Sequence, residues 1–310
     1  MSTRLILWAI AVLVLVALPP VMTAIGQTFY IDLVRRIMIL AIAAVSLNLI
    51  LGYGGMVSFG HAAYLGIGAY AVGVLGFYGV TSGWLQWATA IGASALVALA
   101  IGAVSIRTSG IYFIMITLAF TQMLYYLGIS LEVFGGDDGM RLKSRSQFAG
   151  LVDLNDPIAF YYVALALMLL AVFFVYRLVN SRFGMVLRAA KSNEARARAI
   201  GFSPYPYRLA AFVIAGAMCG LAGALYANHT SYIVPGLMSW QQSGDIMFMV
   251  ILGGMASTAG PVLGTFALLI VEEFLKGWTE HWQVILGPLL VLSVIFFRRG
   301  LAGMFYKPDA

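Results

Sequence analysis

Residues 37–106 read IMILAIAAVSLNLILGYGGMVSFGHAAYLGIGAYAVGVLGFYGVTSGWLQWATAIGASALVALAIGAVSI, and this stretch decides the fold. It contains no Asp, Glu, Lys or Arg and a single histidine, His61. A helix that crosses a bilayer needs about 20 mostly apolar residues, so the stretch is long enough for three crossings. Glycine and turn residues divide it into pieces of that length. We therefore predict membrane spans here.

The rest of the 310-residue chain has the same character. It is 62% hydrophobic and 10% charged, whereas soluble domains are about 45–50% apolar and about 25% charged. We predict an all-α polytopic membrane protein forming one transmembrane domain over residues 1–310, with an outer loop at 132–157 and a cytoplasmic loop at 180–208. The ten expected spans cover residues 5–25, 35–51, 62–80, 84–106, 109–131, 158–179, 209–230, 244–257, 260–276 and 282–299. The eighth is short for a crossing.

The first apolar run could be a signal peptide, because Arg4 precedes it. However, the run continues to Ile25 through Pro19 and Pro20, and no small-x-small cleavage motif follows. We expect a retained first span.

Lys and Arg indicate the orientation, because cytoplasmic loops are enriched in them. The segment from Arg177 to Arg208 carries seven basic residues and one acid, Glu194, and is assigned to the cytoplasm. Counting crossings from there places both termini inside and loop 132–157 outside. Arg35 and Arg36 fall on the outer side and do not fit the rule. The net charge of +6 is thereby read as orientation, and no nucleic-acid partner is expected.

Motifs for chemistry are missing from the sequence. There is no G-x-x-x-x-G-K-[ST] phosphate loop, and no paired carboxylates or Ser–His–Asp arrangement can be placed within the membrane. The single Cys219 lies in an apolar run, which excludes an intrachain disulfide and a Cys-based metal cluster. We therefore expect neither an enzyme nor a cofactor or metal in this chain. Transport is the function that remains by elimination.

A glycine-rich break gives a positive signal for transport. Residues 51–61 hold four glycines in nine residues, and backbone opened at membrane depth must face protein or water rather than lipid. A related string, with Gly-Met-x-Ser after Leu-Gly, occurs at residues 251–261. Glycine-interrupted segments in two halves of a transporter indicate its binding region. The hypothetical pathway residues are Asn48, Gly52, Tyr53, Gly54, Gly55, Ser58, His61, Gly253, Gly254 and Ser257.

Other interpretations of this break remain open. The glycines also fit tight helix packing or a loop at the membrane surface. A lone histidine beside an apolar helix is commonly a satisfied packing residue, and Asn48 also fits an interhelical hydrogen bond.

Residues 188–208 predict a short helix outside the membrane. Ser192 or Asn193 suits an N-cap, Glu194 suits the first turn, and Gly201 is placed to end the helix. Pro204 and Pro206 prevent its continuation. A helix of about two turns is marginal alone and needs a surface to dock on. The alternative is a basic loop on anionic lipid.

Three strings, residues 47–55, 58–61 and 191–201, resemble the LivM-type permeases of branched-chain amino acid ABC importers. The similarity covers about residues 35–300. It implies a bacterial inner-membrane protein that pairs with a homologous LivH-type permease, two ABC ATPase subunits that bind the ATP, and a substrate-binding protein. Residues 193–201 would then be the coupling helix, formed by Asn193, Glu194, Ala195, Arg196, Arg198 and Gly201. The family often has Glu-Ala-Ala-x-x-x-Gly there, whereas Gly201 follows Glu194 by seven positions.

The resemblance also suggests a docking site for the binding protein at Arg141, Lys143 and Arg145, although a solvated loop fits these residues equally well. Branched-chain amino acids are the family's usual cargo, and urea-like amides or aromatic acids are alternatives. An ion-coupled secondary transporter, a channel and a membrane-embedded enzyme are the rival classes. The first of these normally needs ionisable groups deep in the membrane, and this sequence offers almost none.

Overall fold

A computed structural model describes residues 3–150, 153–296 and 300–305, and the described chain is almost entirely helical. Each expected span corresponds to a helix, so the all-α prediction is confirmed. These helices are α1 (Thr3–Ile25), α2 (Thr28–Asn48), α3 (His61–Phe77), α4 (Gly83–Ser105), α5 (Ile111–Ser130), α6 (Pro157–Val179), α9 (Pro204–Thr230), α10 (Trp240–Gly253), α11 (Gly260–Trp278) and α12 (Trp282–Phe296). The last residues of the tenth expected span, 297–299, lie outside the described part, as does Lys307 in the tail.

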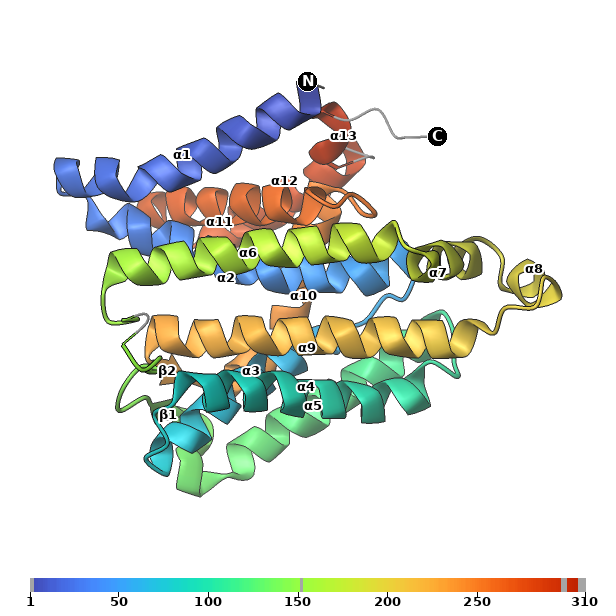
Figure 1. Cartoon of the computed structure of the whole chain (residues 1–310), viewed down its shortest axis with the longest axis horizontal. Coiled ribbons are helices and arrows are strands. Elements are labelled where there is room, and N and C mark those ends of the chain that lie inside the picture. The colour runs from blue at the N-terminus through green and yellow to red at the C-terminus, as the bar shows by residue number, and fades with distance from the viewer. Residues whose placement is uncertain (1–2, 151–152, 297–299, 306–310) are drawn as a thin grey trace.

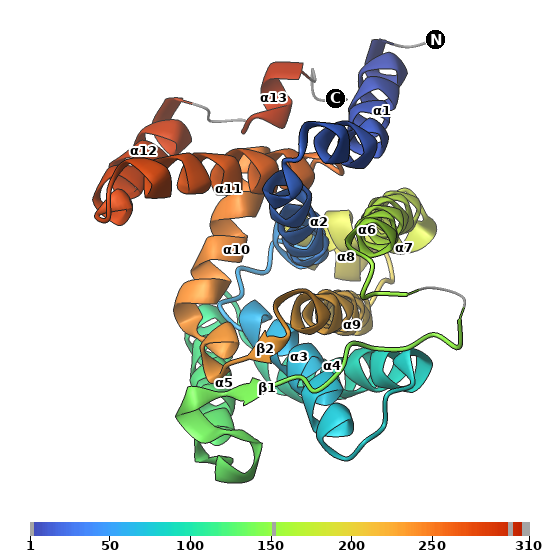
Figure 2. The same ribbon diagram turned by 90° about the vertical axis from the view of Figure 1, so that its left-hand side faces the viewer.

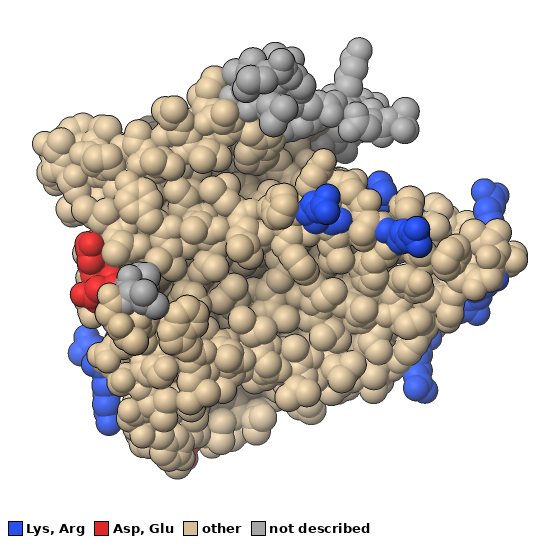
Figure 3. Space-filling model, in the orientation of Figure 1, with Lys and Arg blue, Asp and Glu red and all other residues tan. Residues whose placement is uncertain are grey.

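Six of the described helices are long and apolar enough to cross a membrane: α1, α4, α5, α6, α9 and α2 with its continuation to Tyr53. The helices α3 and α12 are apolar but shorter. Figure 3 shows the matching charge pattern, with the coloured side chains of this face toward its two ends and a broad uncharged middle. A belt of this kind is what a bilayer requires of a protein that it surrounds.

The two ends of the bundle carry different structures (Figure 1). At one, the sheet end, β1 (Met140–Arg141) pairs antiparallel with β2 (Tyr232–Ile233), close to the short helices η2 (Glu132–Phe134) and η3 (Gly136–Asp138). At the other, the α8 end, α7 (Arg182–Ser192) and α8 (Glu194–Ala199) connect α6 to α9. The remaining described elements are η1 (Leu49–Tyr53), η4 (Pro235–Met238) and α13 (Ala302–Phe305).

Helix α2 lies at the centre of the bundle, in contact with α6, α9, α10 and α11. Its residues from Ile37 to Ile50 are almost completely buried. Small residues bring the other helices close, as they do in membrane bundles generally. A Cβ at Gly68 of α3 would lie 2.0 Å from the carbonyl oxygen of Gly220 in α9. These two helices therefore touch backbone to backbone.

Helix α10 corresponds to the expected eighth span at 244–257 and is, as expected, short for a crossing. It has 14 residues, or about 21 Å at the usual helical rise, and Figure 2 shows it lengthwise where α6 and α9 are seen nearly end-on. The chain still passes from β2 at the sheet end to Ala256, which contacts Asn48 near the α8 end. Before α10, Met238 of η4 is enclosed between glycines of α3 and α5, so this irregular backbone faces protein.

A polar network accounts for Arg35, which the positive-inside rule leaves unexplained. Its side chain is almost fully buried near the sheet end, where it pairs with Asp32 and donates from Nε to His229 Nδ1 at 3.0 Å. The guanidinium also lies 4.7 Å from the ring centre of Phe160. Arg36 is 3.8 Å from Glu272, which also pairs with Lys276. Both arginines thus hold helices together, and Glu272 is engaged in ion pairs with Arg36 and Lys276.

Candidate functional site

The first glycine-rich string forms a genuine break between α2 and α3. After Asn48 the helix widens into the π-helix η1, and residues 54–60 are not helical before α3 begins at His61. Single π-turns within α-helices are frequent at functional sites. Gly55 adopts a φ of +69°, and a Cβ there would lie 2.9 Å from the Lys191 side chain. Both the backbone conformation and the space at this position therefore require glycine.

The second string lies against the first. Asn48 Nδ2 donates to the Ser257 carbonyl oxygen at 2.8 Å, and the Ala256 N–H donates to Asn48 Oδ1 at 3.1 Å. Gly254, with a φ of +113°, lies in a short turn between α10 and α11. Asn48 thus makes the interhelical bonds that its position suggested, and it joins the two strings near the α8 end.

Three other predicted pathway residues are buried in protein. His61 and Ser58 are almost inaccessible to solvent, and His61 Nε2 lies 2.7 Å from the hydroxyl of Ser46 in α2. The Ser58 hydroxyl accepts from the Gly60 N–H at 3.1 Å, and Tyr53 is also buried. The structure therefore places these side chains in the core, and His61 occupies the packing environment named above as its alternative.

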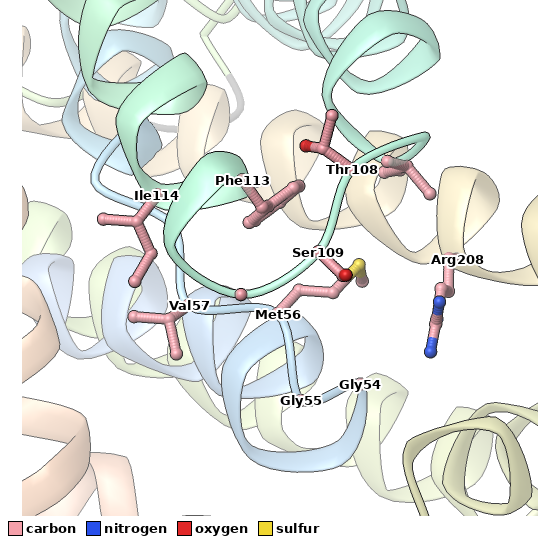
Figure 4. A pocket seen from close by; sticks show the side chains of 11 residues that line it. Gly54, Gly55, Met56, Val57, Thr108, Ser109, Phe113, Ile114 and Arg208 are labelled. Carbon is pink, nitrogen blue, oxygen red and sulfur yellow. The ribbon is translucent and has the colours of Figure 1, made fainter. Parts of the chain in front are cut away.

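A pocket of about 110 Å³ lies beside the first break. It is bounded by residues 54–57, by the loop between α4 and α5, and by Arg208 of α9. Figure 4 shows Met56 pointing from the break toward Ser109, with Arg208 on the other side of the open space. Of the predicted pathway residues, Gly54 and Gly55 line this pocket, which lies toward the α8 end of the bundle.

The predicted short helix is present as α8, with the N-cap at Asn193. The Asn193 side chain accepts from the Arg196 N–H at 2.9 Å, and Gly201 follows the helix with a φ of +91°. Figure 1 shows α8 standing beyond the ends of the long helices. Ala195, Arg196 and Arg198 are exposed, as are two large apolar residues next to α8, Ile200 at 65% and Phe202 at 43%.

Glu194 ties α8 to the transmembrane bundle. Its carboxylate accepts from Arg208 in α9 at 2.7 Å and from Arg198 in α8 at 2.5 Å. Burial alone would raise the pKa of Glu194, but the hydrogen bonds and positive charges of Arg208 and Arg198 outweigh it and lower the pKa below its usual value. Glu194 is thus held ionised, and its pair with Arg208 joins α8 to the start of α9.

A second contact joins this region to the glycine break. Lys191, at the end of α7, donates from Nζ to the Gly52 carbonyl oxygen at 2.6 Å. Arg208 also donates to the Ala190 carbonyl oxygen at 3.2 Å. Since Gly52 belongs to η1, hydrogen bonds connect α8, the start of α9, the end of α7 and the break.

Helix α7, Lys191 and Arg208 are parts of this site that the sequence did not predict. The signal for α7 is the spacing of Phe183, Val186, Leu187 and Ala190, of which the last three are buried. This helical spacing of apolar residues was obscured by the basic residues around it. For Lys191 and Arg208 no local signal exists, since their partners are distant in sequence.

The three basic residues of the outer loop have different environments. Arg141 and Lys143 are exposed at the sheet end, with Lys143 Nζ 5.5 Å from the ring centre of Phe77. Arg145 is half-buried and donates to the Leu154 carbonyl oxygen at 2.8 Å. Arg145 therefore has a structural bond, and Arg141 and Lys143 are the two available at the surface.

Comparison with known proteins identifies relatives along most of the chain. A family model described as "Branched-chain amino acid transport system / permease component" matches residues 29–294. The high-affinity branched-chain amino acid transport system permease protein LivM of Escherichia coli (strain K12) is 29% identical over 96% of this chain and 75% of its own. The probable LivM of Methanocaldococcus jannaschii is 26% identical, over 86% and 88%. LivH of the same Escherichia coli strain is 24% identical, over 85% and 91%. No solved structure matches.

Proposed function

Because this chain belongs to the family of branched-chain amino acid transport permease components, we propose that it forms half of the pathway of an ABC importer for such amino acids. The other half is a LivH-type permease, since the chain resembles both LivM and LivH proteins. Two ABC ATPase subunits supply the energy, and a binding protein delivers the cargo at the sheet end. The protein lies in the bacterial inner membrane with both termini and the α8 end in the cytoplasm.

The observation that carries this proposal is the surface of α8. Ile200 and Phe202 are exposed outside the membrane-spanning helices, next to the basic residues Arg196 and Arg198. Exposed apolar residues with a polar rim mark sites of protein–protein contact. A helix of six residues is not stable alone, and it suits the groove of an ATPase subunit that contributes acidic residues around an apolar centre.

The contacts behind α8 suggest how ATPase movement reaches the membrane. The Glu194–Arg208 pair fixes α8 to α9, and Lys191 holds the Gly52 carbonyl oxygen in η1. Displacement of α8 therefore pulls on the break that borders the pocket. This role requires no nucleotide site in the chain itself.

Reconstitution tests the proposal directly. The chain is placed in proteoliposomes alone, then with the candidate LivH-type permease, both ATPases and binding protein, and leucine uptake is measured with and without ATP. Uptake is expected only from the full assembly with ATP. Uptake by the chain alone would contradict the ABC assignment and favour a secondary transporter or channel. Parallel assays with urea, amides and aromatic acids decide the substrate class.

Replacing Lys191 with Met is expected to lower the amount of leucine transported per ATP hydrolysed about tenfold. A hydrogen bond from a charged donor contributes about 1.5–3 kcal/mol, and Met keeps the length of the side chain without the charge. Arg at this position is the matched control and should retain most of the coupling, because it can still donate to Gly52. An unchanged leucine-to-ATP ratio in Lys191→Met would show that this bond does not transmit movement.

A further inference from the structure

Helix α10 carries one face that the described residues of the chain leave uncovered. Ile246, Met249 and Val250 are buried, and α10 packs on α2 and α11. On the other side, Gln241, Asp245 and Phe248 are exposed, at the four- and three-residue spacings that place side chains on one helix face, and Trp240 beside Gln241 is also exposed. Figure 2 shows α10 at the margin of the molecule between α5 and α11.

Asp245 lies within the depth of the bundle and not at either end. Two residues before it, the Ser243 hydroxyl accepts from the Ala62 N–H in the first turn of α3 at 3.0 Å. The neighbouring His61 contacts Ser46 of α2, and Ser46 lies seven residues before the end of the continuous span Thr28–Tyr53. A carboxylate at this depth therefore lies where acyl chains surround the protein, unless water or another protein covers it.

The Asp245 carboxylate has no hydrogen bond or ion pair with any described residue of the chain. The negative charge of Glu272 acts against it, and Glu272 is itself bonded to Lys276. Charged side chains in membrane segments face a protein interior or a water-filled cavity, because contact with lipid is costly. The exposed face of α10 thus carries a negative charge that has no cationic partner among the described residues.

We propose that Asp245 binds the ammonium group of the amino acid cargo as the cargo passes along the exposed face of α10. This inference rests on the proposed function. The Gln241 amide, one helical turn away, can donate to the cargo carboxylate, while Phe248 and Trp240 offer apolar surface for a branched side chain. The face therefore matches all three parts of such a zwitterion.

A single carboxylate on an open surface also suits weak, transient binding of the cargo. A pathway site must bind strongly enough for the cargo to enter and weakly enough for it to leave. A cation of the partner permease is the alternative occupant of this face, and it predicts a different result. Removing the carboxylate would then weaken assembly of the two permeases.

The test compares Asp245→Asn with Asp245→Glu in the full complex. The Asn variant is expected to lower ATP-driven leucine uptake at least tenfold, with co-purification of the partner permease and stimulation of ATP hydrolysis by the binding protein unchanged. The Glu variant should retain most of the uptake. Glu132→Gln, which neutralises an exposed carboxylate at the sheet end, is the control and should stay within twofold of the parent. Uptake by Asp245→Asn within twofold of the parent would overturn the proposal, and so would loss of the partner permease.

A labelling experiment separates this inference from the proposed function. Phe248→Cys, which leaves Asp245 in place on the same helix face, is made in a Cys219→Ala background, because Cys219 is the chain's single cysteine. The assembled complex in nanodiscs is treated with a charged methanethiosulfonate. Modification that millimolar leucine slows is expected. No modification, or modification that leucine does not affect, would overturn the cargo contact. If the parent complex shows no ATP-driven uptake, the proposed function fails. Protection from labelling at Phe248→Cys that is lost when Asp245→Asn is added still decides whether Asp245 contacts the amino acid.

Discussion

Ala197→Pro is expected to abolish ATP-driven leucine uptake while the permease still inserts and assembles. The Ala197 N–H donates to the Asn193 carbonyl oxygen at 3.1 Å, and the side chain is 2% exposed. Proline removes this donor and clashes with the carbonyl four residues earlier, at a cost of about 3 kcal/mol or more. A helix of six residues has no other source of stability large enough to offset that loss.

The measurement is uptake in proteoliposomes beside ATP hydrolysis by the same preparation, with assembly checked by size-exclusion chromatography. Glu194→Pro is compared with Glu194→Ala, because both lose the carboxylate that pairs with Arg208 and Glu194 occupies the first helical position, where proline is tolerated. Asn193 before it is already extended, with φ −159° and ψ 105°, as a residue preceding proline prefers. Glu194→Pro should therefore behave like Glu194→Ala, which loses only the carboxylate. Transport by Ala197→Pro within twofold of the parent would show that α8 does not transmit the movement of the ATPase subunits to the membrane.

Gly223→Ala is expected to destabilise the whole permease, although alanine is the smallest possible change. A Cβ at Gly223 of α9 would lie 2.0 Å from the Leu65 carbonyl oxygen of α3 and 3.0 Å from the Ala69 nitrogen. Both contacts are with backbone, so no side chain can move aside and the two helices must separate. Overpacking of this kind typically costs about 1–3 kcal/mol, and occasionally more.

Thermal stability in detergent, followed by loss of the monodisperse peak, measures this effect. Gly92→Ala in α4 is the control, because a Cβ there would have no neighbour within 4 Å. It should leave the transition unchanged or raise it slightly, since alanine favours helix over glycine by about 1 kcal/mol. Equal transition temperatures for the two variants would show that the contact between α3 and α9 is not tight in the assembled protein.

Local sequence signals were sufficient for the elements. The apolar run after Arg36 placed α3, α4 and the end of α2 within three residues, because lipid accepts only helices whose backbone bonds are internal. The start of α2 at Thr28 lies seven residues before the expected one, because Asp32, Arg35 and Arg36 interrupt the apolar pattern there. Asn193 and Gly201 gave the ends of α8, because capping depends on residues next to each other in the chain. The glycine break was also predicted, because several closely spaced glycines disfavour a helix whatever side chains pack around them.

Local signals failed where partners are far apart in sequence. Arg35 looked misplaced until His229 and Phe160 were seen around it, and Lys191 showed no link to Gly52 in the sequence. The direction of α10, which differs from that of α6 and α9 (Figure 2), could not be predicted from its apolar pattern, because packing against neighbouring helices sets the tilt.

By itself the sequence determined that this chain is a helical membrane permease with a glycine break and a short helix outside the membrane. Composition, periodicity and capping are properties of neighbouring residues. The bilayer restricts the possible structures further, because backbone hydrogen bonds must be satisfied within the protein. The tertiary structure alone decided that the two glycine strings meet through Asn48, that Glu194 and Lys191 tie α8 and α7 to the bundle, and that Asp245 is left unpaired. Each of these depends on contacts between segments up to about two hundred residues apart in the sequence, which packing selects and no local pattern specifies.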